Sequence, residues 1–318
     1  MKTIPLLILT IIVSISTAFS QENLVKGDSQ AGVNSYLELP HIEVIPIKDT
    51  KAGRQYELYI KLPEGYSDTT DTQYPVIYYT DAMWHVEMLS GSVEFIVEEA
   101  ILVGISWQKD INEDLLQERG AHVSRYRDYS IMPSSNPEHQ AKYQFGQGSN
   151  HLTFIRNDVI AYVEKNYLTD PDKRTYFGYS MGGKFGAYVL LTQPDTFKNY
   201  ILGSPSLWRE NPYFSELESP ATLNANVFIS YGSLEKELSE HIDTFIAMLK
   251  AKNDGSLQLN HVVIEGSHQT AFPMTAVRGI YWLADLIKRT VYRRLNPTRI
   301  HGTHHEKPLD HPDSFCCL

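Results

Sequence analysis

One short segment, residues 173–186, constrains the fold of this chain more than any other. It reads Lys-Arg-Thr-Tyr-Phe-Gly-Tyr-Ser-Met-Gly-Gly-Lys-Phe-Gly, which predicts a short apolar strand, a glycine-bracketed serine and then a helix. This is the layout of a nucleophile elbow, G-x-S-x-G, with the serine on a strained turn between strand and helix. Gly178 and Gly182 let neighbouring backbone pass that turn without a Cβ clash. A serine that merely caps a helix has the same pattern, so the rest of the chain must distinguish a nucleophile from a cap.

Residues 1–20 have the composition of a secretory signal peptide. Lys2 gives a positive start, residues 4–15 form an apolar run, and residues 18–20 (Ala-Phe-Ser) are suited to cleavage. The apolar run is short for a membrane span, which is the alternative explanation. We therefore expect an exported protein, periplasmic or secreted, with no stable membrane association after the leader is removed.

Charge and cysteine content exclude several classes of partner and of fold. The net charge is −10 at pH 7, and loss of the leader with its single lysine changes it to −11. An acidic surface argues against nucleic acid or an anionic membrane as the main partner. The two cysteines, Cys316 and Cys317, lie at the extreme C-terminus. Disulfides therefore do not hold the fold together.

After a polar lead-in at residues 21–40, strand and helix patterns alternate through residues 41–295. Two half-exposed strands, at 41–47 and 54–62, predict an antiparallel hairpin at the edge of a sheet. Further strands are predicted at 74–81, 100–105, 175–179, 200–203, 226–230 and 257–264, with helices at 84–99, from 151 onward, and at 181–191, 236–252 and 274–293. This order indicates an α/β fold with a mostly parallel sheet and helices on both faces.

Two segments depart from this alternation. Residues 107–150 are polar, rich in arginine and aromatic residues, and predict a long irregular lid or substrate loop. Residues 296–318 are polar and rich in Pro and His, and are expected to be disordered. The histidines of this tail have no framework that would enforce coordination, so no metal site is expected there.

A serine nucleophile needs a base that is itself held by an acid, and on this fold the chain order is serine, acid, histidine. Each should follow a parallel strand, where loops converge. His268, in Gly-Ser-His after the last strand, fits this demand. The other histidines precede Ser180, lie within a predicted strand or helix, or belong to the tail. His268 is therefore the predicted base.

Two acidic residues compete for the third position. The strand at 226–230 is followed by Tyr-Gly-Ser-Leu-Glu-Lys-Glu. Glu235 falls in the loop directly after the strand, whereas Glu237 falls in the first turn of the next helix. A carboxylate there also stabilises the helix through its dipole, which is the simpler explanation for both. We predict Glu235 as the acid, with Glu237 as the alternative.

The tetrahedral intermediate of such a reaction needs two N–H donors for its oxyanion. One is the amide of Met181, directly after the serine and at a helix N-terminus, where N–H groups are unsatisfied. The other should come from residues 80–83, after the strand at 74–81. We predict the amide of Ala82.

The motifs of this chain are similar to those of one known family. The chain resembles the putative esterase family of α/β-hydrolases, which includes esterase D and the bacterial ferric-siderophore esterases. The matching stretches are YPVIYYTD at 74–81, RYRDYS at 125–130, GYSMGG at 178–183, SPSLW at 204–208, GSLE at 232–235 and GSH at 266–268. They span roughly residues 40–290, and the family's serine, acid and histidine fall on Ser180, Glu235 and His268.

The resemblance also implies a substrate loop beside the active site. Arg125 and Arg127 fall there, and either contacts an anionic group of the substrate or pairs with an aspartate to tether the loop. Trp208 is a candidate wall of the substrate pocket, with a place in the core as the alternative. In one respect the chain departs from the family, which usually has Asp-Gly where this chain has Asp81-Ala82.

The sequence thus predicts an exported serine hydrolase that cleaves a small-molecule carboxylic ester through an acyl-enzyme. No metal or organic cofactor is needed for this chemistry. The resemblance favours a ferric-siderophore esterase, with a feruloyl or acetyl esterase acting on carbohydrate as the second choice. A catalytically silent binding protein on the same fold is the alternative from another class.

Overall fold

The computed structural model describes residues 39, 41–217 and 222–295. The predicted signal peptide (1–20), nearly all of the lead-in (21–40) and the tail (296–318) lie outside these residues. Side chains are described up to Arg289. No helix within the described residues is both long and apolar enough to cross a membrane.

Eight strands form one sheet in the order β1-β2-β4-β3-β5-β6-β7-β8. They are β1 (Ile42–Lys48), β2 (Gln55–Lys61), β3 (Tyr74–Tyr79), β4 (Ile101–Ile105), β5 (Thr169–Tyr179), β6 (Asn199–Gly203), β7 (Asn226–Gly232) and β8 (Gln258–Ile264). β2 runs antiparallel to both β1 and β4, and every other pair is parallel. The expected antiparallel hairpin at the edge of a mostly parallel sheet is confirmed.

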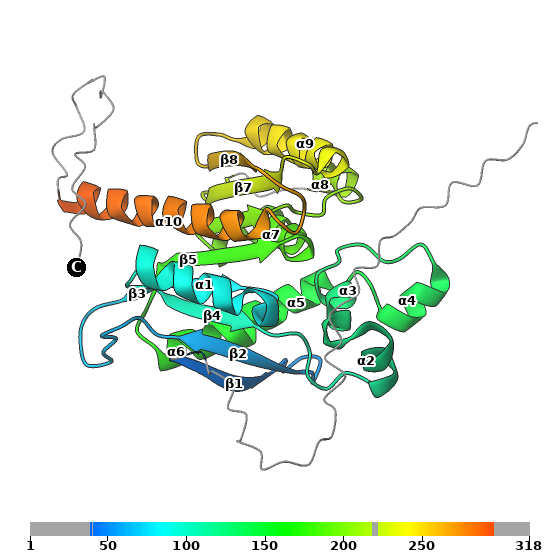
Figure 1. Ribbon diagram of the computed structural model, residues 1–318, viewed down its shortest axis with the longest axis horizontal. Helices are drawn as coiled ribbons and strands as arrows, with labels where there is room; N and C mark the ends of the chain where they lie inside the picture. The colour runs from blue at the N-terminus through cyan, green and yellow to red at the C-terminus, as the bar shows by residue number, and fades with distance from the viewer. Residues whose placement is uncertain (1–38, 40, 218–221, 296–318) are drawn as a thin grey trace, which may run out of the picture. The chain divides into compact units, whose positions relative to one another are not determined.

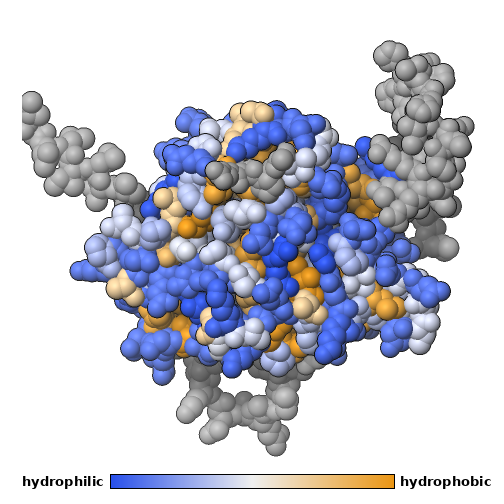
Figure 2. Space-filling view, turned by 180° about the vertical axis from the view of Figure 1, so that it is seen from behind, coloured by the Kyte–Doolittle hydropathy of each residue, from blue (hydrophilic) through white to orange (hydrophobic). Residues whose placement is uncertain are grey.

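Helices cover both faces of this sheet, as predicted. The long elements are α1 (Ala82–Ile96), α5 (Gly148–Phe154) continuing through η2 (Ile155–Ile160) into α6 (Ala161–Asn166), α7 (Met181–Thr192), α9 (Lys236–Lys252) and α10 (Phe272–Leu295). α1 and α10 pack together across one face (Figure 1). The others pack on the opposite face. Seen from behind, the surface is mainly hydrophilic with small hydrophobic patches between (Figure 2).

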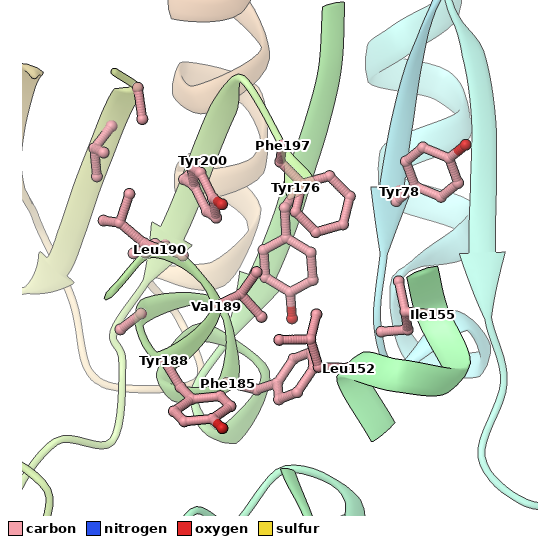
Figure 3. Packing of buried hydrophobic residues seen from close by; sticks show 14 of the residues in the cluster. Tyr78, Leu152, Ile155, Tyr176, Phe185, Tyr188, Val189, Leu190, Phe197 and Tyr200 are labelled. Carbon is pink, nitrogen blue, oxygen red and sulfur yellow. The ribbon is translucent and has the colours of Figure 1, made fainter. Parts of the chain in front are cut away.

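The sheet separates two cores because side chains alternate between its faces along each strand. On β3, Val76 and Tyr78 point into the larger core, while Ile77 and Tyr79 point into the core beneath α1 and α10. In the larger core, Tyr176 of β5 projects toward α7 and α5 (Figure 3). Strands buried on both faces read as continuous apolar runs, which is why β3 and β4 were recognisable in the sequence.

The expectation of a long irregular segment at residues 107–150 is wrong. This segment contains four short elements before α5, namely α2 (Glu113–Arg119), η1 (Ala121–Ser124), α3 (Arg125–Asp128) and α4 (Pro137–Tyr143). The side chains of Asn112 and Asn136 cap α2 and α4. Helices of one or two turns are too short to show a hydrophobic period, and two of the four, η1 and α3, have no side-chain cap either. Two other elements, η3 (Pro194–Thr196) and α8 (Asn211–Glu216), are also too short to show a hydrophobic period.

Two glycines inside helices provide a matched test of this packing. A Cβ added to Gly186 of α7 would overlap the Tyr176 ring and lie 2.6 Å from Leu202 Cδ2, whereas one added to Gly91 of α1 has no neighbour within 4 Å. Both substitutions to alanine gain about 0.5–1 kcal/mol of helix propensity. Overpacking at Gly186 should cost about 1–3 kcal/mol, which exceeds that gain. Urea denaturation should therefore show Gly91→Ala more stable, and Gly186→Ala less stable, than wild type. Equal stabilisation of both variants would contradict the packing of α7 on β5 and β6.

Candidate active site

The serine of the predicted elbow sits in a backbone conformation that side-chain-bearing residues rarely adopt. Ser180 has φ 57° and ψ −116° and lies between the end of β5 and the start of α7. Its N–H donates to Gly203 O at 2.9 Å, and its carbonyl accepts from Lys184 N at 3.0 Å. A non-glycine residue with positive φ persists only where the surroundings hold it.

The bracketing glycines are required by the closeness of the chain on either side of the turn. A Cβ on Gly178 would overlap the carbonyl of Gly182, and a Cβ on Gly182 would lie 2.5 Å from Thr80 Oγ1. β5 can therefore turn sharply into α7 only because both positions lack a side chain. The turn projects the Ser180 hydroxyl beyond the carboxyl end of the sheet.

The structure brings Ser180, His268 and Glu235 together in a chain of hydrogen bonds. His268 Nε2 lies 2.9 Å from Ser180 Oγ, and His268 Nδ1 lies 2.5 Å from Glu235 Oε1. The three residues follow β5, β8 and β7, which are parallel, so their carboxyl ends meet at one edge of the sheet. The histidine ring can thus accept the serine proton on Nε2 while its Nδ1 is hydrogen-bonded to the carboxylate.

Glu235 is the acid that contacts the histidine, and Glu237 lies in the first turn of α9. The Glu235 side chain is 5% exposed. Burial alone raises its pKa, but hydrogen bonds from His268, from Gly232 N at 2.5 Å and from Ser204 Oγ at 2.7 Å outweigh burial and lower the pKa below its ordinary value. The carboxylate is therefore held ionised where an imidazolium would need it.

Two further residues brace this arrangement, and neither could be selected from the sequence as part of the site. Tyr179 Oη donates to the backbone carbonyl of His268 at 2.6 Å. Ser204 is fully buried, and its hydroxyl reaches both Glu235 Oε2 and, at 3.0 Å, Tyr179 Oη. The acid and the base are therefore tied to each other through the strand ends as well as directly.

The two amides predicted for the oxyanion both lie at helix N-termini. Met181 is the first residue of α7 and Ala82 the first of α1, so neither has an acceptor within its own helix. Ala82 is fully buried, whereas Met83, one position further along α1, is 50% exposed. The amide of Met83 also lies in the first turn of α1, so Met83 is a second candidate beside Ala82 for this role.

Both predicted substrate arginines are engaged by carboxylates. Arg125 Nη2 donates to Asp81 Oδ2 at 3.0 Å, and its Nε lies 2.7 Å from Oδ1. Arg127 pairs with the adjacent Asp128 at 2.7 Å and donates to Tyr56 Oη at 3.2 Å. Arg125 thus forms the tethering pair that was the alternative explanation, whereas Arg127 and Asp128 are joined to β2 through Tyr56. A role in substrate binding stays a prediction.

Exposed aromatic residues flank these elements. Trp208, in the loop after β6, is 59% exposed and so lies outside the core, and Trp84 of α1 is 50% exposed. The Arg125 guanidinium lies over the Trp84 ring at 4.7 Å. Tryptophans with half of their surface exposed are available for contact with a bound molecule. Trp84 was not selected from the sequence, where it read as an ordinary helix residue.

The bond from Ser204 to Glu235 predicts a pH-dependent loss of stability in Ser204→Ala. Because the pKa of Glu235 is depressed in the folded state, its contribution is present above the ordinary carboxyl pKa and is lost as the pH falls through the folded pKa. Ser204→Ala should cost about 1–3 kcal/mol at neutral pH, as for a hydrogen bond to a charged group. That difference from wild type should shrink as the pH falls.

Denaturation of both proteins from pH 7 down to pH 3 measures this. Ser215→Ala is the control, because its exposed hydroxyl donates to a nearby carbonyl, that of Pro212, rather than to a carboxylate. A Ser204→Ala difference that is constant with pH would mean that Glu235 is not the partner that matters.

Comparison with known proteins places the chain among esterases. It is 27% identical over 228 residues to the ferri-bacillibactin esterase BesA of Bacillus subtilis, covering 65% of this chain and 75% of that protein. The crystal structure of the BES protein from Bacillus cereus superposes with a TM-score of 0.67 at 24% identity, over 80% of this chain and 99% of the other. An IroE-like serine hydrolase from Shewanella oneidensis superposes with a TM-score of 0.62 at 20% identity, over 78% and 80%.

These two structures show that the fold is of the α/β-hydrolase type, as the sequence predicted. Residues 50–290, which include the whole of the Ser180, Glu235 and His268 arrangement, match the model of the family described as Putative esterase. The chain belongs to the putative esterase family.

Proposed function

We propose that this protein is an exported serine esterase that hydrolyses siderophore esters through an acyl-enzyme. The observation that carries the proposal is the chain of hydrogen bonds from Ser180 through His268 to Glu235, within a member of an esterase family. A catalytically silent relative has no need for a serine, a base and an ionised acid in register.

In the first half of the reaction, Ser180 Oγ bonds to the carbonyl carbon of the ester while its proton passes to His268 Nε2. The carbonyl electron pair moves onto its oxygen, and amides at the N-termini of α7 and α1 stabilise the resulting charge. Glu235 stabilises the imidazolium through Nδ1. When the oxyanion collapses, the bond to the alcohol oxygen breaks, and that oxygen leaves with the proton from Nε2.

The second half repeats these steps with water. His268 takes a proton from the water as its oxygen bonds to the acyl carbon. Collapse of the second intermediate breaks the bond to Ser180 Oγ, which regains its proton from Nε2, and the carboxylic acid is released. No other group is required for the atoms and charges to balance.

Two observations support a siderophore ester as the substrate. The relatives include the ferri-bacillibactin esterase of B. subtilis, which is 27% identical over 228 residues, and a siderophore triacetylfusarinine C esterase of Aspergillus fumigatus, which is 25% identical over 145 residues. The exposed rings of Trp84 and Trp208 also offer apolar area to a large ligand beside the site. The signal peptide predicted at residues 1–20 supports export.

Covalent labelling tests the nucleophile. A fluorophosphonate probe should label the wild-type protein and leave Ser180→Ala unlabelled, because the probe reacts only with an activated serine hydroxyl. His268→Ala should reduce the labelling rate by about 10³-fold or more, as removal of the base does in such triads. Gel fluorescence with intact-protein mass spectrometry measures both. Equal labelling of wild type and Ser180→Ala, or labelling of neither, would end the serine-esterase proposal.

A hydrolysis panel tests the substrate class. We expect turnover of 4-nitrophenyl esters and of a trilactone siderophore in its iron-loaded form, with kcat/KM for the siderophore exceeding that for a feruloyl sugar ester by about 100-fold or more, equivalent to about 3 kcal/mol of differential transition-state binding. Liquid chromatography of the products follows each reaction. A preference for the feruloyl ester would instead indicate the carbohydrate esterase. Activity confined to long acyl chains would contradict both.

A further inference from the structure

A second hydroxyl lies against the nucleophile, and the mechanism above does not use it. Ser206 Oγ is 3.2 Å from Ser180 Oγ, and the Ser206 N–H donates to the Ser180 carbonyl at 3.1 Å. Ser206 belongs to the loop after β6, whereas Ser180 directly follows β5. The two hydroxyls are therefore brought together by the register of neighbouring strands rather than by sequence proximity.

The loop that carries Ser206 is fixed at both ends. Before it, Ser204 N donates to Ser230 O at 2.7 Å, and Ser204 Oγ reaches Glu235. After it, Glu210 forms an ion pair at 3.2 Å with Lys184 of α7, and the two side chains are 5% and 9% exposed. Lys184 N also donates to the Ser180 carbonyl. The same short stretch of α7 thus holds both the nucleophile and the loop beside it.

Counting protons sets the direction of the Ser206 bond. Neutral His268 directs its Nδ1–H to the Glu235 carboxylate, so Nε2 carries a lone pair and must accept the single proton of Ser180. Ser180 then has no proton left for Ser206. In the resting enzyme, Ser206 is therefore the donor and Ser180 Oγ the acceptor.

Attack on an ester removes this acceptor. Once Ser180 Oγ bonds to the acyl carbon, it becomes an ester-type oxygen with less charge to offer a donor. The oxygen of the leaving alcohol is attached to the same carbon, and it gains charge as its bond to that carbon breaks. The Ser206 hydroxyl can redirect its proton by rotation about its own Cβ–Oγ bond.

We propose that Ser206 is a further catalytic residue, whose hydroxyl donates to Ser180 Oγ at rest and to the oxygen of the leaving alcohol during acylation. This inference rests on the proposed serine-esterase function. The proton that the alcohol keeps still comes from His268 Nε2. Ser206 supplies a hydrogen bond and retains its own proton.

The dependence on the leaving group tests this role. When an alkyl alcohol leaves, the negative charge that develops on its oxygen needs far more stabilisation than the charge on nitrophenolate, which is delocalised over the ring. Ser206→Ala should therefore lower kcat/KM for the ethyl ester of a given acid by about 10-fold, the value of one hydrogen bond. It should lower kcat/KM for the 4-nitrophenyl ester of the same acid by no more than about twofold. Ser206→Thr, which restores a hydroxyl, should recover most of the ethyl-ester activity.

Controls separate this role from a structural one and from the proposed function. Ser206→Cys keeps the size of the side chain but is a weak donor, so it should reproduce the selective loss even if Ser206→Ala does not fold. Ser215→Ala, in α8, should match wild type on both esters. Equal losses on the two esters, or no loss on either, would overturn the role of Ser206 while the wild-type activity still stands. A wild-type protein inactive on both esters would instead remove the proposed function, and this inference with it.

Discussion

The structure of the active site depends on one backbone constraint, the positive φ of Ser180. A turn of this kind is unfavourable for a residue with a side chain, and it survives here because neighbouring chain over-determines it. Strand β6 accepts its N–H, while α7 and the loop after β6 donate to its carbonyl. These bonds hold the nucleophile from the helix that follows it directly and from the end of β6 with its adjoining loop.

The order of strands in the sheet explains why these elements lie next to Ser180. β6, β7 and β8 follow β5 in sequence and in space, each running parallel to the last. Each successive carboxyl end therefore adds one loop to the same edge of the sheet. The first contributes Ser204 and Ser206, the second Glu235 and the third His268, so the site is assembled in chain order.

Sequence reasoning recovered the parts of this arrangement that carry a local signal. β3 and β4 were visible as apolar runs, and the elbow as a spacing of glycines around Ser180. It failed at residues 107–150, where helices of one or two turns are too short for periodicity and where η1 and α3 have no side-chain cap. It also could not select Tyr179 or Ser204 as part of the site, because an interior tyrosine and a buried serine acquire their partners only when strands register. The pairing of Arg125 with Asp81 could not be predicted from the sequence for the same reason.

The pairing of Arg125 with Asp81 has a consequence for how the segment at 107–150 can vary. Asp81 is fully buried and accepts from Trp107 Nε1 at 2.7 Å as well as from Arg125. A buried charge that loses its partner is strongly destabilising. Because Asp81 lies between β3 and α1, loss of either partner would disturb the junction of these two elements. If the whole segment is exchanged between relatives, the protein should fold only when Trp107, Arg125 and Asp81 are all kept or all replaced together.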